Sequence, residues 1–108
     1  MPCTRIAMWS GPRNISTAMM RSWEHRVDTQ VWDEPLYPRW LSRNSNAHPG
    51  REEVLRAHQE DLDAEDLKRR LAAAPSESSI FYQKHMAHHL CTETVGEWMA
   101  KCRHAFLV

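Results

Sequence analysis

The chain has 108 residues, of which 42% are hydrophobic and 26% charged, and its 14 Lys and Arg residues balance its 14 Asp and Glu residues. This length allows one domain with a single core, and the composition is typical of a globular chain and not of a disordered one. The net charge of zero argues against a general nucleic-acid-binding or anionic-membrane-binding surface, because both need a basic excess.

The compartment is predicted from the cysteines and from the apolar runs. Cys3, Cys91 and Cys102 form no CxxC pair and are odd in number, which favours a reduced, cytoplasmic chain. The apolar run near the N-terminus is stopped by residues 10–13, so we expect no signal peptide. No stretch approaches the ~20 apolar residues of a membrane span, so no membrane partner is expected.

The first third of the chain predicts a strand, a turn and a helix. Residues 5–9 are an apolar run typical of a buried strand, and 10–14 are a polar turn. A helix is expected from Ser16 to about His25. Its core-facing side is predicted from helical spacing to be Ile15, Met19 and Trp23.

A second strand and a long loop are expected next. Residues 29–32 predict the strand, which ends before Pro35 because a proline biases Glu34 away from helix. The stretch 36–49 contains further prolines and is predicted to be an irregular loop.

The remaining elements alternate between helix and strand. Residues 51–74 predict helix in two pieces, with an N-cap in the 63–66 segment. A third strand is expected at 80–84, a short helix at 93–102 and a fourth strand at 104–108. The last strand is apolar throughout, which predicts a central strand buried on both faces.

This order predicts a single α/β domain over residues 1–108, with a parallel sheet and helices on both faces. Ligands of such sheets bind at the carboxyl ends of the strands. The segments expected to meet there are 10–17, 33–37 and 84–89.

The loop after the first strand lacks the residues of the common nucleotide loops. When Gly11 is aligned with the first glycine of GxxxxGK[ST], Ser16, Thr17 and Ala18 replace the second glycine, the lysine and the magnesium-binding hydroxyl residue. The dinucleotide fingerprint needs three glycines, and this turn has one.

What the loop offers instead is an arginine and two hydroxyl groups at a helix start. Arg13 can place two N–H groups on an oxyanion, and Ser16 and Thr17 can bond a phosphate oxygen without a metal. The alternative interpretation is structural: Ser16 or Thr17 is an N-cap, and Arg13 is a solvated turn residue.

The segment SGPRNISTAMM resembles the 5′-phosphosulfate-binding loop of the sulfotransferases, and WDEPLY and YQKHMAHHL extend the likeness. The chain is similar to a bacterial sulfotransferase-like group, related also to the N-terminal region of plant branched-chain aminotransferase-like proteins. Ile15 departs from the pattern, because it replaces the family's glycine. The resemblance implies a P-loop NTPase-like sulfotransferase fold, of which this chain is expected to be an N-terminal part, truncated at its C-terminus.

The resemblance also implies a reaction. The donor would be 3′-phosphoadenosine 5′-phosphosulfate, transferring its sulfuryl group to a hydroxyl or amine of a small-molecule acceptor. The donor's 5′-phosphosulfate would be held by Arg13, Asn14, Ser16 and Thr17. Lys84 would stabilise the bridging oxygen, against the alternative of a surface lysine at a strand end. The acceptor's proton would go to Glu34 or His88, and the sequence leaves that choice open.

No metal is expected in this site. The spacing of His85, His88, His89 and Cys91 matches no standard zinc pattern, and sulfuryl transfer needs no metal. Tyr37 and Trp40 are candidates to line an acceptor pocket.

Two rival functions stay open. One is a non-catalytic nucleotide-binding or phosphate-binding regulatory module associated with an aminotransferase. The other is a magnesium-dependent kinase or triphosphatase, against which the missing loop lysine argues. As part of a sulfotransferase, the 108 residues are expected to be inactive alone and to self-associate through an uncovered sheet.

Overall fold

The computed structural model describes residues 3–12, 14–44, 50–73 and 78–107. Its centre is a parallel sheet in the order β2-β3-β1-β4. The strands are β1 (Thr4–Ser10), β2 (Thr29–Asp33), β3 (Ile80–Met86) and β4 (Cys102–Leu107). This architecture confirms the predicted α/β class.

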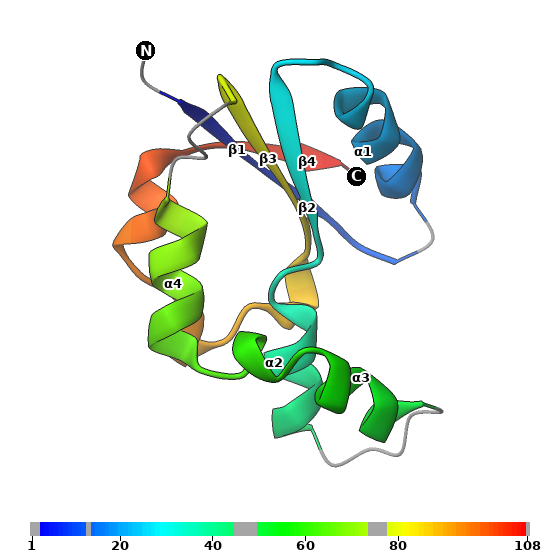
Figure 1. The fold of residues 1–108 in the computed structure, drawn as a ribbon, viewed down its shortest axis with the longest axis vertical. Coiled ribbons are helices and arrows are strands. Elements are labelled where there is room, and N and C mark those ends of the chain that lie inside the picture. The colour runs from blue at the N-terminus through cyan, green and yellow to red at the C-terminus, as the bar shows by residue number, and fades with distance from the viewer. Residues whose placement is uncertain (1–2, 13, 45–49, 74–77, 108) are drawn as a thin grey trace.

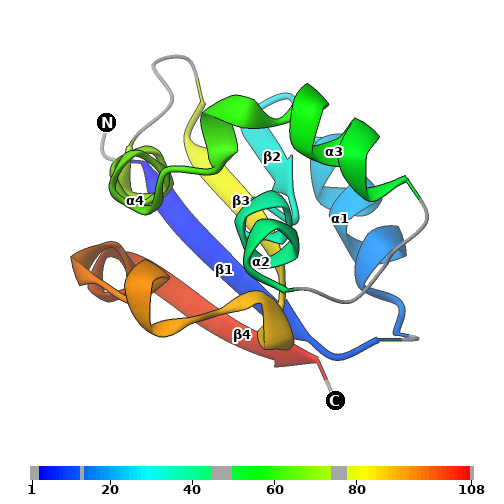
Figure 2. The ribbon, with the colours of Figure 1, turned by 90° about the horizontal axis from the view of Figure 1, so that it is seen from below.

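The helices lie on both faces of the sheet and beyond its carboxyl edge. They are α1 (Ser16–Glu24), α2 (Tyr37–Arg43), α3 (Arg51–Ala57) and α4 (Ala64–Ala72). Short 3₁₀ turns follow at Gln59–Asp61, Ala87–His89, Thr92–Thr94 and Glu97–Lys101. Figures 1 and 2 show α1 on one side of the sheet and α4 on the other, with α2 and α3 beyond the strand ends.

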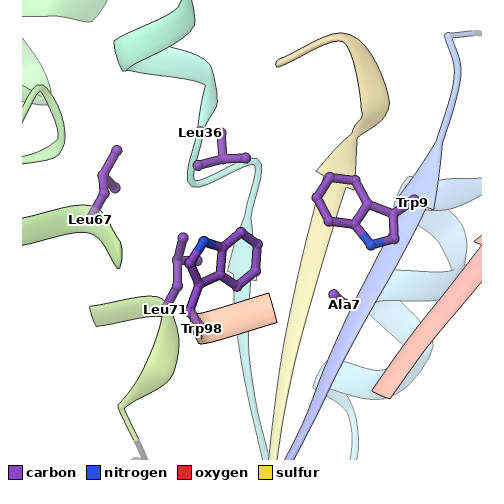
Figure 3. Close-up of a cluster of buried hydrophobic side chains, with 6 residues drawn as sticks. All are labelled: Ala7, Trp9, Leu36, Leu67, Leu71 and Trp98. Carbon is purple, nitrogen blue, oxygen red and sulfur yellow. The ribbon is translucent and has the colours of Figure 1, made fainter. Parts of the chain in front are cut away.

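The face toward α4 carries the larger apolar cluster (Figure 3). Alternate β1 residues point to opposite faces, so Ala7 and Trp9 enter this cluster while Met8 faces α1. Trp98 is buried here, and its indole N–H donates to the Thr94 carbonyl at 2.7 Å. The buried members of the cluster are Ala7, Trp9, Leu36, Leu67, Leu71 and Trp98.

The face toward α1 has a different helical stripe from the predicted one. Met20 is fully buried against Met8 and Tyr82, and Met19 and Trp23 are partly buried beside them. Ile15 is 64% exposed, which contradicts its predicted place in the core. The reason is its position: it is the N-cap residue of α1, so its side chain precedes the first turn that packs on the sheet.

The predicted loop 36–49 is wrong over its first half, where α2 forms. Pro38 stands in the first turn of α2, where a helix does not need the missing N–H. Leu36 and Leu41 are buried and fix the helix against the rest of the molecule. Residues 45–49 lie outside the described part of the chain.

Two predicted helices break into shorter pieces. In 51–74 the break is near the expected place, and the Asp63 carboxylate caps α4 by accepting from the backbone N–H of Glu65 at 3.2 Å. The predicted helix 93–102 is wrong, because 3₁₀ turns form there. Extended backbone at Val95 and at Gly96 separates those turns, so no α-helix can run through them.

The last strand also differs from the sequence-based expectation. Within the described residues β4 pairs only with β1, so it is an edge strand and not a central one. Phe106 is 72% exposed on it. Self-association through this strand stays a prediction.

Candidate functional site

The carboxyl ends of β1, β2 and β3 meet at one edge of the sheet, as the parallel topology requires. Lys84 on β3 is in register with Met8 on β1 and with Asp33 on β2. The three segments that leave these strands are therefore neighbours, and Lys84 near the end of β3 contacts Asp33 and Glu34 at the end of β2.

Lys84 is held between two carboxylates at this edge. Its ammonium donates to Glu34 Oε2 at 2.9 Å and to Asp33 Oδ1 at 3.2 Å. Its side chain is 5% exposed, against 48% for Asp33 and 31% for Glu34. Burial disfavours the charged ammonium, but the hydrogen bonds and charges of Glu34 and Asp33 outweigh it and raise the pKa of Lys84. Lys84 is thus a buried cation and not a solvated strand-end lysine.

Glu34 has an unusual backbone conformation. Its φ is +49°, the left-handed region that residues other than glycine adopt at a cost. Its backbone N–H donates to the Lys84 carbonyl at 2.9 Å, so main chain and side chain both tie Glu34 to β3. Strain of this kind gathers at functional sites, which makes the Glu34–Lys84 pair the centre of the candidate site.

A cavity of about 470 Å³ opens beside this ion pair. One wall comes from the end of β2 and the start of α2, and another from the turn after β3. Aromatic, acidic and imidazole side chains share the lining, and its residues are Trp32, Asp33, Glu34, Tyr37, Pro38, His58, Asp61, Met86, His88 and His89. Small-molecule sites combine apolar walls with polar groups, and in this cavity acidic and histidine residues make up six of the ten lining residues.

The histidines after β3 have different surroundings. His88 is exposed and its ring meets the ring of Trp40 edge-on, with centroids 5.2 Å apart. His89 is buried, and its Nδ1 lies 3.9 Å from Glu34 Oε1, too far for a hydrogen bond. Burial, with the charges of His88 and Lys84, lowers the pKa of His89 to about 4. His89 is therefore neutral at pH 7 and forms no ion pair with Glu34.

His85 belongs to the core and not to the site. It is 1% exposed, and its ring stacks on Trp9 with centroids 4.5 Å apart. Gln83 donates to the Leu71 carbonyl at 2.8 Å, which turns the amide oxygen toward His85 Nε2 at 2.9 Å. His85 is thus a packed, neutral ring, and burial lowers its pKa to about 3.

The loop between β1 and α1 forms a second, more open region. The Asn14 amide donates to the Leu107 carbonyl at 3.2 Å and so ties the loop to the end of β4. Ser16 is buried and Thr17 exposed, and neither hydroxyl makes a hydrogen bond within the described residues. The N-cap is Ile15, which has no side-chain cap, so the N-cap interpretation of Ser16 and Thr17 is wrong.

The structure brings only some of the predicted site residues together. Lys84 and Glu34 are in contact, and Glu34 and His88 line one cavity. Asn14 lies in the separate loop, Ser16 and Thr17 lie at the start of α1, and none of the three lines that cavity. Arg13 lies outside the described residues. The chemical roles of these residues stay predictions.

Sequence reasoning missed the acidic and imidazole groups that follow α3. His58, Glu60 and Asp61 place their ligand atoms within 4.8 Å of one another, close enough together to hold a metal ion. The sequence predicts residues 58–61 only as part of the helical stretch 51–74. The tight spacing of these residues at a helix end was the available signal.

Comparison with known proteins decides the family. A model of the sulfotransferase domain family matches residues 4–108. The chain belongs to this family. The α/β fold with its loop from β1 into α1 is a part of the sulfotransferase fold, as the sequence had suggested.

Two curated plant relatives from Arabidopsis thaliana extend the comparison. The chain is 31% identical over 103 residues to branched-chain-amino-acid aminotransferase-like protein 1 and 29% identical over 103 residues to protein 2 of that name. Each match covers 95% of this chain and 18% of the relative, so this chain spans about a fifth of the length of either relative.

No solved structure matches the chain. Among the described residues, no helix is both long and apolar enough to cross a membrane.

Proposed function

We propose that this domain binds 3′-phosphoadenosine 5′-phosphosulfate and transfers its sulfuryl group to a hydroxyl or amine of a small acceptor. Membership of the sulfotransferase family supports the class of reaction. The observation that carries the donor assignment is the start of α1, which has neither a side-chain cap nor an acidic residue in its first turn. Within the described residues the N–H groups of this first turn have no side-chain cap, and together with the partial positive charge of a helix start they suit an anion.

The loop residues fit a phosphosulfate group by their chemistry. Asn14, Ser16 and Thr17 offer amide and hydroxyl groups, and Arg13 would add a guanidinium. Gly11 leaves open space where a side chain would stand, since a Cβ built there meets nothing within 4 Å. A ligand can thus approach the backbone of the loop closely.

Lys84 would provide positive charge near the departing oxygen of the donor. An ammonium has three N–H donors, and Asp33 and Glu34 accept two of them, so one is left for a ligand oxygen. The two carboxylates hold the cation in place before a substrate arrives, which is how preorganised charge stabilises a transition state.

The acceptor would bind in the cavity beside Glu34. Tyr37 and Trp32 offer flat apolar surfaces there, and His88 and Glu34 offer polar groups. Glu34 and His88 are the two residues proposed from the sequence to take the acceptor's proton. The three cysteines are free, which suits the reduced cytoplasm where we place the protein.

A second function is favoured by the relatives, whose names mark them as aminotransferase-like. Under this proposal the domain binds a nucleotide or phosphate without catalysis and regulates an attached enzyme. Both proposals use the same loop, and because the 108 residues are expected to be inactive alone, donor binding by this chain tests the loop and does not decide between them.

Ligand preference tests the donor proposal. Adenosine 3′,5′-bisphosphate should raise the melting temperature with or without magnesium, and more than ATP with magnesium does. At 100 times its dissociation constant a ligand adds about 2.7 kcal/mol of stability, which a thermal-shift assay resolves. Stabilisation by ATP alone, and only with magnesium, would instead support a kinase or triphosphatase.

A further inference from the structure

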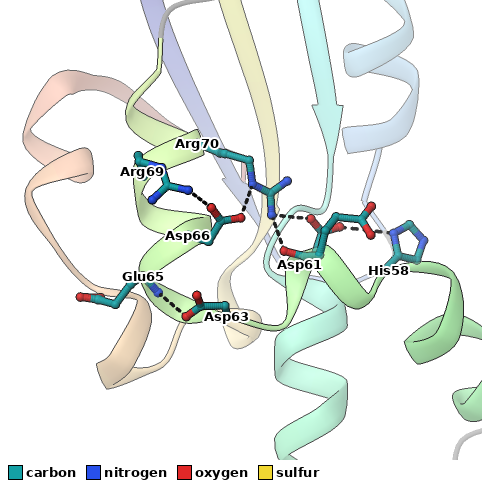
Figure 4. A network of polar contacts seen from close by, with 8 residues as sticks. His58, Asp61, Asp63, Glu65, Asp66, Arg69 and Arg70 are labelled. Carbon is teal, nitrogen blue, oxygen red and sulfur yellow. Dashed lines mark hydrogen bonds and ion pairs between the residues drawn. The ribbon is translucent and has the colours of Figure 1, made fainter.

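His58 and Asp61 form an imidazole–carboxylate pair at the wall of the cavity (Figure 4). His58 Nδ1 lies 3.3 Å from Asp61 Oδ2. An ionised carboxylate only accepts hydrogen bonds, so the proton of a neutral His58 resides on Nδ1. The lone pair of Nε2 is then free, and Nε2 has no hydrogen-bond partner among the described residues.

Asp61 is held rigidly in this pair. Its side chain is 8% exposed, and its other oxygen, Oδ1, accepts from the Arg70 guanidinium at 2.7 Å. The guanidinium is fixed in turn by the Asp66 carboxylate at 3.0 Å and the Glu60 carbonyl at 2.8 Å. It also lies over the ring of Trp32, 5.1 Å from its centroid. A buried carboxylate with this support can orient an imidazole as a base.

Arg70 also argues against a metal ion in the same cluster. A guanidinium 2.7 Å from Asp61 Oδ1 already neutralises the carboxylate. A divalent ion on His58, Glu60 and Asp61 would place a second cation beside Arg70, where the two would repel.

The other polar groups at the cavity are less suited to accept a proton. His88, a base expected from the sequence, contacts the rings of Trp40 and His89 and has no carboxylate partner among the described residues. Glu34 Oε2 is occupied by Lys84 at 2.9 Å. His89 is buried and 3.9 Å from its nearest carboxylate. Among the described residues, only His58 combines a place in the cavity wall with a carboxylate within hydrogen-bond distance of its ring.

We propose that His58 is the base that accepts the proton of a hydroxyl group bound in the cavity, with Asp61 and Arg70 as positioning residues. This inference rests on the proposed sulfuryl transfer. The acceptor oxygen forms its bond to sulfur while its proton passes to His58 Nε2. The electron pair of the sulfur–oxygen bond that breaks leaves with the donor's phosphate. Because Trp32 and Tyr37 line the cavity, the acceptor class is a small alcohol or phenol with an apolar body.

Acylation by diethyl pyrocarbonate measures the free lone pair directly in the 108-residue chain. Peptide mass spectrometry should find His58 modified several-fold faster than His25, an exposed histidine without a carboxylate partner among the described residues. Asp61→Asn should abolish this difference. Glu60→Gln is the matched control and should preserve it, because the Glu60 side chain does not orient the ring.

Two further measurements keep the proposal testable if Asp61→Asn fails to fold. In the unaltered chain, ¹⁵N NMR of the imidazole should show the proton of His58 on Nδ1. Phenol, as the simplest probe of the acceptor class, should slow acylation of His58 and not of His25. A proton on Nε2, equal rates for His58 and His25, no protection by phenol, or binding of Zn²⁺ by His58 would each overturn the proposal.

The outcome is separable from that of the donor proposal. Suppose that adenosine 3′,5′-bisphosphate fails to bind while His58 shows the expected tautomer, acylation rate and protection by phenol. The proposal of sulfuryl transfer is then wrong, and the proposal that His58 is a base still holds. If the bisphosphate binds but His58 reacts like His25, the donor site remains and the base is wrong.

Discussion

The candidate site has two regions, and they differ in how many of their charged and hydrogen-bonding groups already have partners within the protein. At the ends of β2 and β3, Lys84 is buried and contacts both Asp33 and Glu34. In the loop between β1 and α1, Gly11 and Thr17 are exposed, and the helix start has no side-chain cap. In the first region the buried charge already has partners within the protein, whereas in the second the start of the helix has no side-chain cap and can accept an anion from outside.

This difference indicates a division of labour. Groups that must hold a fixed charge during a reaction benefit from rigid partners, since reorganisation then costs little. Groups that only bind a substrate can remain open to water, because the ligand supplies the missing partners. We therefore expect changes at the strand ends to affect folding, and changes in the loop to affect binding alone.

The largest expected effect comes from acid, acting on the packed histidines. Burial lowers the pKa of His85 to about 3 and that of His89 to about 4, from an ordinary value of 6.5. Below about pH 6.5 the unfolded chain binds protons that the folded chain does not, so stability decreases as the pH falls toward 4. The expected slope is about 1.4 kcal/mol per pH unit for each histidine.

Urea unfolding between pH 6.5 and 4.5 measures this slope. His89→Gln should reduce this slope by the contribution of one histidine, about 1.4 kcal/mol per pH unit, because glutamine does not titrate. A stability that does not change over this range would mean that the two imidazoles are protonated in the folded chain as in the unfolded chain. Burial would then not lower their pKa values.

The next effect is the loss of the buried cation. Lys84→Met leaves Asp33 and Glu34 as neighbouring carboxylates, and breaking a fully buried ion pair costs about 3–5 kcal/mol. The side chains of these acids are 48% and 31% exposed and can regain water. We therefore expect the free energy of unfolding, measured by chemical denaturation, to fall by about 2 kcal/mol.

Lys68→Met is the matched control for Lys84→Met. Lys68 pairs with Glu65, whose side chain is 77% exposed, and such surface pairs contribute less than about 1 kcal/mol. Equal losses in the two variants would show that Lys84 behaves as an ordinary surface lysine.

The smallest effect on folding is expected in the loop. Gly11→Ala adds a Cβ that meets nothing within 4 Å, and the φ of Gly11 is not in the left-handed region, so the change in stability should stay within about 0.5 kcal/mol. Affinity for adenosine 3′,5′-bisphosphate should nevertheless fall several-fold, because the methyl group occupies space that the ligand needs.

Differential scanning calorimetry measures the change in stability, and isothermal titration calorimetry measures the change in ligand affinity. Gly96→Ala, whose Cβ would lie 3.0 Å from Lys68 Cδ, is the control that alters packing away from the loop. Unchanged ligand affinity in Gly11→Ala would remove the loop from the proposed donor site.

Strands and the first helix were predictable because their signals are local. Residues 5–9, 29–32 and 80–84 are short apolar or β-branched runs, and each forms a strand. Asp63 capped α4 near the predicted position, since an N-cap depends only on the next few residues. The loop 36–49 was predicted wrongly because its prolines were taken to exclude a helix, whereas Pro38 stands in the first helical turn, where a proline is compatible with a helix.

The candidate site was less predictable, for a different reason. Strand ends identified Lys84 and Glu34, and the sheet topology did bring them together. His58 and Asp61 stand at no strand end, and their meeting with Arg70 depends on how α3 and α4 pack. Burial of His85 and His89 likewise depends on aromatic neighbours from distant segments.

The sequence by itself determined the α/β class, the parallel alternation and the positions of the strand ends, because hydrophobic periodicity and turn residues act over a few neighbours. The tertiary structure alone decided that β4 is an edge strand within the described residues, that Lys84 is a buried cation, and that His58 faces a cavity with Asp61 behind it. These outcomes depend on contacts between residues far apart in the chain. Such contacts form only when the sheet and its helices have packed.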